Sequence, residues 1–343
     1  MSKYLELFNK LQSAAPQTKN SHVLIIDGTN TFIRVFANVP ALNENGDHVG
    51  GVVGFLRSVG ALIRKELPTR CIVVFDGVGG SQRRRSIYPD YKSNRKNNIS
   101  FNRFAEFKDL QDEKESIKIQ FSRIIQYLDC LPVDILTIDN IEADDTIAYL
   151  VNHFKQFDSK ITISSTDRDF LQLVTDKVVV WNPIKKIHYN IEQIEKEFGL
   201  LKENYLIYRV LTGDASDNIP GVKGVGLKTL LKTFPELKNK KMEVGNILEE
   251  CEKHQNDKAK IWNAITSHKS TIELNHKLMQ LSINDFSGHA KLNIINKLDT
   301  KTPLLKQEFL KIFFEDGLHF IIKDPHDWLQ QTFNRLDIYE RKR

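Results

Sequence analysis

Short apolar runs recur along the first half of the chain, and several of them end at an acidic residue. They read HVLII, CIVVF, VDILTI, KITIS and KVVVW, and they begin at residues 22, 71, 133, 160 and 177. Runs of this length and composition are typical of buried strands in a parallel sheet. Helical patterns separate the runs, notably at residues 145–157. Strands that alternate with helices predict an α/β fold, with a parallel sheet flanked by helices.

Three other regions break this pattern. Residues 1–13 have the apolar spacing of a short amphipathic helix, and a linker follows them. Residues 79–120 are polar and strongly basic at first, with aromatic residues interspersed, and then lead into a helical pattern at 106–128. Residues 203–235 form a predicted helix followed by a glycine-rich string. We therefore expect an N-terminal extension over 1–20, a core over 21–200 and a mainly helical region over 201–343.

Composition narrows the class of protein only a little. The formal net charge of +5 suits a polyanionic partner but is common among proteins that have none. Cys71, Cys130 and Cys251 form no CxxC pair, which argues against a zinc ribbon or a disulfide framework. No apolar run approaches the ~18 residues of a membrane span, and the first residues lack the apolar core of a signal peptide. We expect a soluble intracellular protein without membrane association.

The acidic residues should gather at one edge of the sheet. In parallel sheets, ligands bind outside the carboxyl ends of the strands. Four of the acids follow predicted strands, and three open the helix that follows another strand. They are Asp27, Asp76, Asp167, Asp169, Glu142, Asp144 and Asp145.

Two interpretations compete for this cluster. Acids are favoured in the first turn of a helix, and Thr166 with Asp169 has the spacing of a capping box. We expect capping to leave Asp27 and Asp76 unexplained, because they follow strands. Carboxylates this close repel one another, and a divalent cation removes that penalty. Oxygen ligands without His or Cys suit Mg²⁺, which Mn²⁺ can replace, and seven acids suit two ions.

The basic stretch lies directly after Asp76, beside the proposed metals. A run of bases is often only a solvated surface, but interleaved tyrosines favour a grip on single-stranded nucleic acid. Lys92 or Arg95 could stabilise charge on a phosphate during cleavage. The candidate contacts are Arg83, Arg84, Arg85, Tyr88, Tyr91, Lys92, Arg95 and Lys96.

The glycine-rich string IPGVKGVGLKT predicts a phosphate-binding hairpin. Its glycines allow a tight turn with outward N–H groups before a helix, although an ordinary helix–turn–helix corner also uses glycine. It lacks the spacing of a Walker A loop. The acids Asp214 and Asp217 lie just upstream and could bring the hairpin to the metal edge. The candidate contacts are Gly221, Lys223, Gly224, Gly226 and Lys228.

Six strings, taken in order, resemble the 5′-nuclease family of flap endonucleases, polymerase 5′-nuclease domains and phage RNase H-type exonucleases. They are IIDGTN, VVFDG, YPDYKSNR, IEADD, SSTDRDFLQL and GDASDNIPGVKGVGLKT, and they span roughly residues 22–235. The phage and bacterial branch is most similar, because its members share EADD and GD-x-x-DN-IPG. The resemblance implies a PIN-like core over 21–200 with an arch or clamp at 79–120. It also implies a helix–hairpin–helix element and further helices over 201–343.

The resemblance also implies roles for individual residues. Lys92 and Arg95 match the bases at the foot of the arch, and Arg34 is a candidate phosphate contact. The hairpin glycines match an element that binds duplex DNA and a K⁺ ion. Asp145 and Asp214 match family acids that could lie in an outer shell. The first metal set would be Asp27, Asp76, Glu142 and Asp144, and the second Asp167, Asp169 and Asp217, with Asp144 serving both.

The implied function is that of a stand-alone Mg²⁺-dependent, structure-specific 5′→3′ exonuclease and flap endonuclease. Its substrates would be branched or flap DNA and RNA–DNA hybrids, and RNase H activity is compatible with this. The resemblance to the phage and bacterial branch also implies a monomer in the cytoplasm of a bacterial or phage-infected cell. The flanking segments could contact a sliding clamp or a single-strand-binding protein, or simply pack on the core. Two alternatives stay open: a Toprim-type enzyme that uses Glu142, Asp167 and Asp169, and a junction-binding protein that does not cut.

Overall fold

The computed structural model describes most of the chain. No helix in the described part is long and apolar enough to cross a membrane. The amphipathic helix predicted for residues 1–13 lies outside the described residues. The described ranges are 18–96, 101–105, 107–254, 260–281, 286–320 and 322–341.

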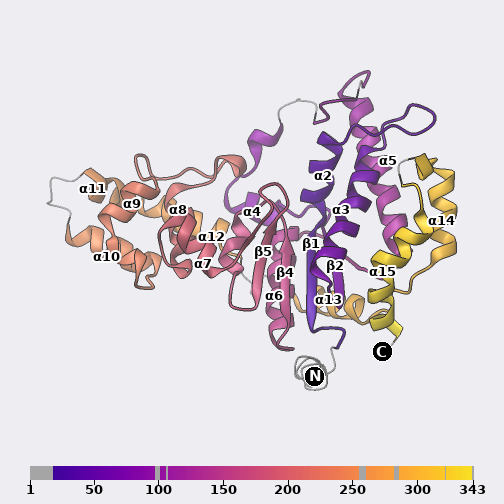
Figure 1. The fold of residues 1–343 in the computed structure, drawn as a ribbon. Helices are drawn as coiled ribbons and strands as arrows, with labels where there is room; N and C mark the ends of the chain where they lie inside the picture. Colours follow the sequence, from indigo (N-terminus) through magenta and orange to yellow (C-terminus); the bar gives the residue numbers. More distant parts are fainter. Residues whose placement is uncertain are drawn as a thin grey trace, which may run out of the picture.

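A six-stranded sheet forms the centre of the molecule, in the order β3-β2-β1-β4-β5-β6 (Figure 1). The five predicted strands are all present and pair in parallel. The sixth strand, which we did not predict, pairs antiparallel with β5 at the edge. The strands are β1 (His22–Asp27), β2 (Arg70–Asp76), β3 (Asp134–Ile138), β4 (Lys160–Ser164), β5 (Val178–Asn182) and β6 (Ile187–Tyr189).

Helices cover both faces of the sheet, as the alternation of side chains along β1 requires. Leu24 and Ile26 face the core beneath α2, α3, α5, α14 and α15. Val23 and Ile25 face the opposite core, beneath α6 and α13. The helices are α2 (Gly28–Asn38), α3 (Gly50–Glu66), α4 (Gln82–Ile87), α5 (Leu110–Asp129), α6 (Ala143–Lys155), α7 (Ile191–Phe198), α8 (Tyr205–Thr212), α9 (Leu227–Thr233), α10 (Val244–Lys253), α11 (Lys260–Ser267), α12 (Lys269–Met279), α13 (Gly288–Asp299), α14 (Lys306–Glu315) and α15 (Pro325–Arg341).

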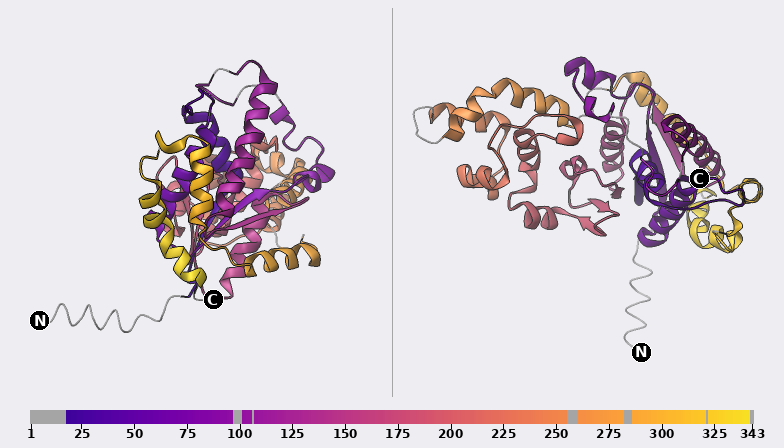
Figure 2. Two further views of the ribbon diagram at one scale, coloured as in Figure 1. Left: turned by 90° about the vertical axis from the view of Figure 1, so that its right-hand side faces the viewer. Right: turned by 90° about the horizontal axis from the view of Figure 1, so that it is seen from above.

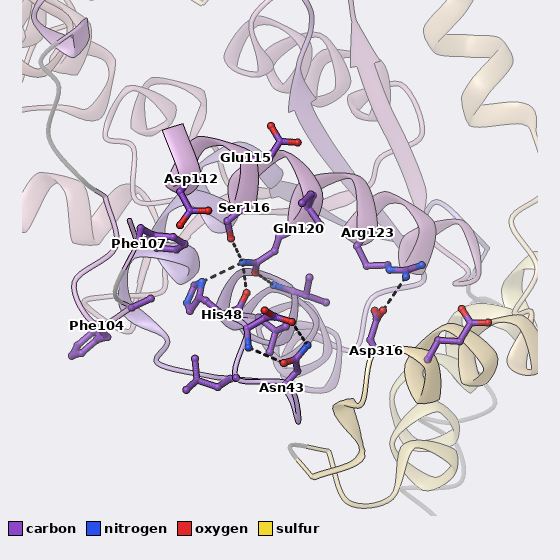
Figure 3. Close-up of a pocket in the computed structure, with 18 residues that line it drawn as sticks. Asn43, His48, Phe104, Phe107, Asp112, Glu115, Ser116, Gln120, Arg123 and Asp316 are labelled. Carbon is purple, nitrogen blue, oxygen red and sulfur yellow. Dashed lines mark hydrogen bonds and ion pairs between the residues drawn. The ribbon is translucent and has the colours of Figure 1, made fainter. Parts of the chain in front are cut away.

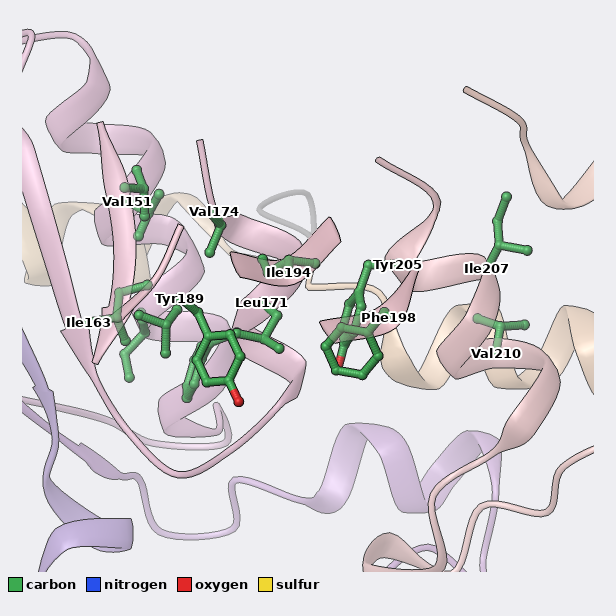
Figure 4. Packing of buried hydrophobic residues seen from close by; sticks show 14 of the residues in the cluster. Val151, Ile163, Leu171, Val174, Tyr189, Ile194, Phe198, Tyr205, Ile207 and Val210 are labelled. Carbon is green, nitrogen blue, oxygen red and sulfur yellow. The ribbon is translucent and has the colours of Figure 1, made fainter. Parts of the chain in front are cut away.

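The second of these cores continues from the sheet into a helical lobe made by α7 to α12. Figure 4 shows Val151 and Ile163, from α6 and β4, in the same apolar cluster as Tyr205 and Val210 from α8. The lobe extends sideways from the sheet, with α10 and α11 farthest away (Figures 1 and 2). Because one core joins the two parts, the start of the lobe is fixed relative to the strands.

The strand order creates a crevice between β1 and β4. The chain builds outward from β1 through β2 to β3, and then returns to place β4 on the other side of β1. Open α/β sheets bind ligands at such a switch point, beyond the carboxyl ends of the strands. The predicted α/β class is confirmed, and its switch point lies where the acidic residues were expected.

Candidate active site

Asp27 and Asp76 both end strands, and both also cap helices. Asp27 is the N-cap of α2, where its Oδ1 accepts a hydrogen bond from the backbone N–H of Asn30 at 3.0 Å. Asp76 Oδ1 accepts one from the backbone N–H of Ala143, the first residue of α6, at 2.8 Å. The expectation that capping would leave these two acids unexplained is therefore wrong. Each of these strands ends beside the first turn of a helix. The carboxylate at the end of the strand can therefore also accept a hydrogen bond from the N-terminus of that helix.

The capping box expected after β4 does not form. The Thr166 hydroxyl hydrogen-bonds with the side chain of Asn30. Asp167 Oδ1 instead accepts from the backbone N–H of Asp169 at 2.7 Å, and the 3₁₀ helix Asp169–Leu173 has no side-chain cap. Glu142, the N-cap residue of α6, does not cap that helix with its side chain either.

Three carboxylates at the switch point, those of Asp27, Asp144 and Asp167, form no ion pair within the described residues. Burial, and then the neighbouring Asp167, raises the pKa of Asp144 well above its ordinary value. Burial raises the pKa of Asp27 to about 7, despite the hydrogen bonds from Asn30 and Ser165. Burial, and then Asp169, raises the pKa of Asp167 to about 7 as well. Lys92 opposes this shift at Asp144 and Arg209 opposes it at Asp167, but burial and the neighbouring carboxylates outweigh both cations.

Glu142, by contrast, is enclosed by donors. Its oxygens accept from Arg84 Nη1 at 2.5 Å, Lys92 Nζ at 2.6 Å and the Ser81 hydroxyl at 2.9 Å. Burial alone would raise the pKa of Glu142, but Lys92 and Arg84 outweigh it and lower that pKa to about 2. The Tyr91 hydroxyl donates to the same carboxylate at 3.1 Å.

Asp169, Asp214 and Asp217 also have basic partners. Arg209, from α8, lies between Asp169 and Asp214 and forms ion pairs with both. Arg95 Nη2 lies 2.5 Å from Asp217 Oδ1. In the part of the chain that the structure describes, no three His, Cys, Asp or Glu side chains stand ready as metal ligands. Basic side chains instead hold Glu142, Asp169 and Asp217 in ion pairs.

The predicted basic contacts divide into buried and accessible ones. Arg84 and Tyr91 are only 3% and 2% exposed, so both point into the protein. Arg85, Lys92 and Arg95 instead line a cavity of about 380 Å³ whose wall also includes Asp76, Gly77, Ser81 and Glu142. Tyr88, Arg83 and Arg34 are half-buried, and the Lys96 side chain lies outside the described residues.

The glycine hairpin joins α8 to α9, with Lys223, Gly224, Gly226 and Lys228 exposed. Gly224 has a φ of 83°. A Cβ at Gly221 would lie 2.1 Å from the carbonyl oxygen of Thr212, at the end of α8. Asp217 lies just before the hairpin and connects it to the basic stretch, because its backbone carbonyl accepts from the Lys92 backbone N–H at 2.9 Å.

Two residues of the site were not predicted from the sequence. Arg209 lies on the buried side of a helix that looked like ordinary core, and nothing in its sequence context distinguishes it. Asn275 of α12 is fully buried and donates to the carbonyl oxygens of Val210 and Pro220, on either side of the hairpin approach. Its hydrogen-bond partners are backbone carbonyl groups, which every residue has, so the sequence does not show this role of Asn275.

A larger cavity, of about 830 Å³, lies elsewhere and shares no residue with the carboxylate edge (Figure 3). Its centre is a hydrogen-bonded pair, in which Gln120 Nε2 donates to the backbone oxygen of His48 at 2.7 Å. Acidic residues such as Asp112, Glu115 and Asp316 outnumber Arg123 on its wall. The volume of a cavity therefore does not identify the active site, because the acidic wall of this larger cavity would repel a phosphate.

Comparison with known proteins agrees with this geometry. Residues 22–199 match the N-terminal resolvase-like domain of 5′-3′ exonucleases, and residues 200–296 match their C-terminal SAM fold. A 5′-3′ exonuclease of Aquifex aeolicus is 34% identical over 293 residues, which cover 83% of this chain and 92% of the relative. Bacillus subtilis DNA polymerase I is 30% identical over 64% of this chain, which spans only 24% of that longer protein.

Solved structures show the same fold. A bacteriophage T5 flap endonuclease, in a complex with DNA and metal ions, has a TM-score of 0.61 at 22% identity and covers 86% of this chain and 99% of its own. Flap endonuclease-1 of Methanococcus jannaschii has a TM-score of 0.53 at 13% identity, with coverages of 93% and 95%. The resemblance inferred from the six strings is confirmed. The chain is a nuclease and belongs to the 5′-3′ exonuclease family.

Proposed function

We propose that this nuclease is a Mg²⁺-dependent, structure-specific 5′→3′ exonuclease and flap endonuclease that removes RNA primers or 5′ flaps. The observation that carries the proposal is the group of Asp27, Asp144 and Asp167 at the switch point, whose carboxylates are close together and form no ion pair in the described structure. A cavity lined by Lys92 and Arg95 lies next to it. Anionic ligands for a cation thus lie beside cationic ligands for a phosphate.

The donor set fits divalent cations with oxygen ligands. Asp27, Asp76, Glu142 and Asp144 would hold one ion, and Asp167, Asp169 and Asp217 a second, with Asp144 shared. Two such ions supply an activated water and stabilise the leaving oxygen during phosphodiester hydrolysis. Mg²⁺ suits this oxygen-only set, and Mn²⁺ can substitute. A structure of the T5 5′-exonuclease with bound zinc indicates that this fold accepts divalent metal ions.

The basic residues would change partners when substrate enters. Lys92 is partly buried, and Glu142 and Asp217 raise its pKa against the effect of burial, so it stays cationic. Arg95 is half-exposed, forms an ion pair with Asp217 and lines the same cavity as Lys92. We infer that a scissile phosphate draws both side chains toward itself. The carboxylates they leave become available as ligands, and the cations stabilise charge that develops on the phosphate.

Contacts with nucleic acid would extend in two directions from this point. Arg83, Arg85 and Tyr88 lie on or beside α4 and suit a single-stranded 5′ end. The exposed hairpin of Gly224 and Gly226 suits the phosphates of the adjoining duplex, with a K⁺ ion on its carbonyl groups. Because such contacts read the backbone, RNA–DNA hybrids and an RNase H activity are compatible with the same surface.

A 5′-labelled flap substrate tests the proposal. Wild type should cut near the junction in Mg²⁺ and not in EDTA, and Asp144→Asn should lose at least about 10²-fold in rate at saturating Mg²⁺. The matched control is Asp158→Asn, the same chemical change at an acid whose only partner in the described structure is Lys177. Cutting by wild type that is independent of metal, or full activity of Asp144→Asn, would refute the two-metal assignment.

A further inference from the structure

The three consecutive arginines of α4 point in different directions, and only Arg84 enters the protein. Its side chain is 4% exposed, against 30% for Arg83, and Arg85 is exposed. An α-helix turns about 100° per residue, so one of three neighbours on this short helix must face inward. The inward side chain, Arg84, contacts the acids Glu142 and Asp145 at the start of α6.

The Arg84 side chain makes four hydrogen bonds with three residues, which belong to two segments, the start of α6 and the end of α12. Nη1 donates to Glu142 Oε2 at 2.5 Å and to Asp145 Oδ2 at 2.7 Å. Nη2 donates to Asp145 Oδ1 at 2.9 Å, which completes a bidentate pair. Nε donates to the carbonyl oxygen of Leu278, near the end of α12, at 2.9 Å. The guanidinium thereby uses four of its five N–H groups inside the protein.

The segment that receives this last bond also holds other parts of the site. The carbonyl of Met279 accepts from Gln172 Nε2 at 3.1 Å, in the 3₁₀ helix that begins at Asp169. The backbone N–H of Leu281 donates to Gln172 Oε1 at 3.0 Å. The end of α12 thus forms hydrogen bonds both with Arg84 of α4 and with the 3₁₀ helix that begins at Asp169.

We propose that Arg84 is a positioning residue, which holds Glu142 in place for the metal site and couples α4 to it. The proposal rests on the metal-dependent function proposed above. Glu142 has one oxygen directed to Lys92 and Ser81, while Arg84 fixes the other and keeps Asp145 beside it. Asp145 is 3% exposed and would lose its bidentate partner without Arg84. Arg84 therefore acts through the carboxylates and not on the substrate.

The planar guanidinium is essential to this role. A lysine could keep the positive charge, but its single ammonium cannot bind Asp145 bidentately while also reaching Glu142 and the Leu278 carbonyl. Loss of a residue that orients a metal ligand typically lowers metal affinity or activity by about 10–100-fold. We expect a loss of this size for Arg84→Gln and for Arg84→Lys alike.

The test measures Mn²⁺ affinity by calorimetry without nucleic acid, and then kcat and KM on a 5′ flap at saturating metal. Arg84→Gln and Arg84→Lys should bind Mn²⁺ at least about tenfold more weakly than wild type, with kcat reduced more than KM is raised. Arg85→Gln is the matched comparison, because Arg85 is next in sequence and lines the cavity. It should raise KM and leave Mn²⁺ affinity unchanged.

Several outcomes would overturn the assignment. Wild-type Mn²⁺ affinity in a folded Arg84→Gln variant, or a change confined to KM, would make Arg84 a structural residue or a substrate contact. Tighter Mn²⁺ binding by Arg84→Gln than by wild type would show that Arg84 competes with the metal for the carboxylates. Wild-type Mn²⁺ affinity in Arg84→Lys would show that only the positive charge of Arg84 matters. If circular dichroism shows that Arg84→Gln does not fold, Arg84→Lys decides in its place. Failure of wild type to bind Mn²⁺ would refute the proposed function itself.

Discussion

At the scale of single residues, charge balance separates the acids of the site into two groups. Glu142, Asp169 and Asp217 have basic partners within hydrogen-bonding distance. Asp27 and Asp144 have none in the described structure, and burial raises the pKa of each. Unbalanced buried charge costs stability, and a fold retains it where binding or catalysis requires it. This difference between the two groups supports the cation site that we propose.

His22 supplies a residue-scale prediction about pH. It is 9% exposed and lies at the start of β1, where burial, Lys160 and Arg335 lower its pKa to about 4 although Glu66 opposes them. In the unfolded chain His22 takes up a proton near pH 6.5, whereas in the folded protein it stays neutral down to about pH 4. The free energy of unfolding should therefore fall as the pH drops through this window, by about 1–3 kcal/mol from this residue.

Urea denaturation at several pH values, compared between wild type and His22→Gln, isolates this contribution. The variant has no titrating group at this position, so its stability should depend less steeply on pH between about 6.5 and 4. Parallel curves for the two proteins would show that His22 does not cause the dependence.

The arginines of α4 show which part of the site could be read from residues alone. The sequence indicated a basic segment beside the acids, and Lys92 and Arg95 do line a cavity there. It could not separate Arg84 from Arg83 and Arg85, because that depends on the rotation of a six-residue helix. The inward direction is fixed by partners far away in sequence, including the carbonyl of Leu278.

At the scale of elements, the glycine hairpin makes a graded prediction. Gly221→Ala should be the most destabilising change, because its Cβ would meet the backbone oxygen of Thr212. Gly224→Ala should cost about 1 kcal/mol, because its φ of 83° disfavours an L-residue although the space is open. Gly226 is the N-cap of α9 with a φ of −102° and open space, so Gly226→Ser should be neutral or slightly stabilising.

Chemical denaturation of the three variants tests this order. The comparison is internal, since all three changes lie within six residues of one another. Equal losses for Gly224→Ala and Gly226→Ser would mean that the hairpin adjusts its backbone freely. The turn would then not be the preformed phosphate-binding element that we propose.

Elements differed in how far they could be predicted. The five parallel strands are short runs in which apolar residues dominate, because helices cover both faces of the sheet, and such runs are visible in a sequence. The three-residue β6 carries no such run. The end of α12 was not identified as part of the site either, because it contributes carbonyl oxygens, which every residue has. The acids could be identified from the sequence because their side-chain carboxylates are the groups expected to bind the metal.

At the scale of the whole molecule, α14 and α15 lie beyond residue 296, where the match to the family's C-terminal domain ends. They complete the core on the side of the sheet that faces away from α6. Trp328 packs closely on Gly60 of α3, and Arg64 Nη1 donates to the Thr332 hydroxyl at 2.5 Å. Glu340 pairs with Lys19, just before β1. These contacts connect both ends of the described chain at the end of the sheet opposite the acids.

We therefore expect α15 to support the fold without taking part in cleavage. Leu329 is fully buried in this core, so Leu329→Ala should lower the free energy of unfolding by about 2–5 kcal/mol. At 20–25 °C, where the variant remains folded, kcat, KM and Mg²⁺ dependence on a 5′ flap should match those of wild type. Leu292→Ala is the matched control, because Leu292 is 60% exposed and should lose less than about 0.5 kcal/mol. A large fall in kcat for folded Leu329→Ala would show that the packing of α15 reaches the carboxylate edge, and that the two ends of the sheet are coupled.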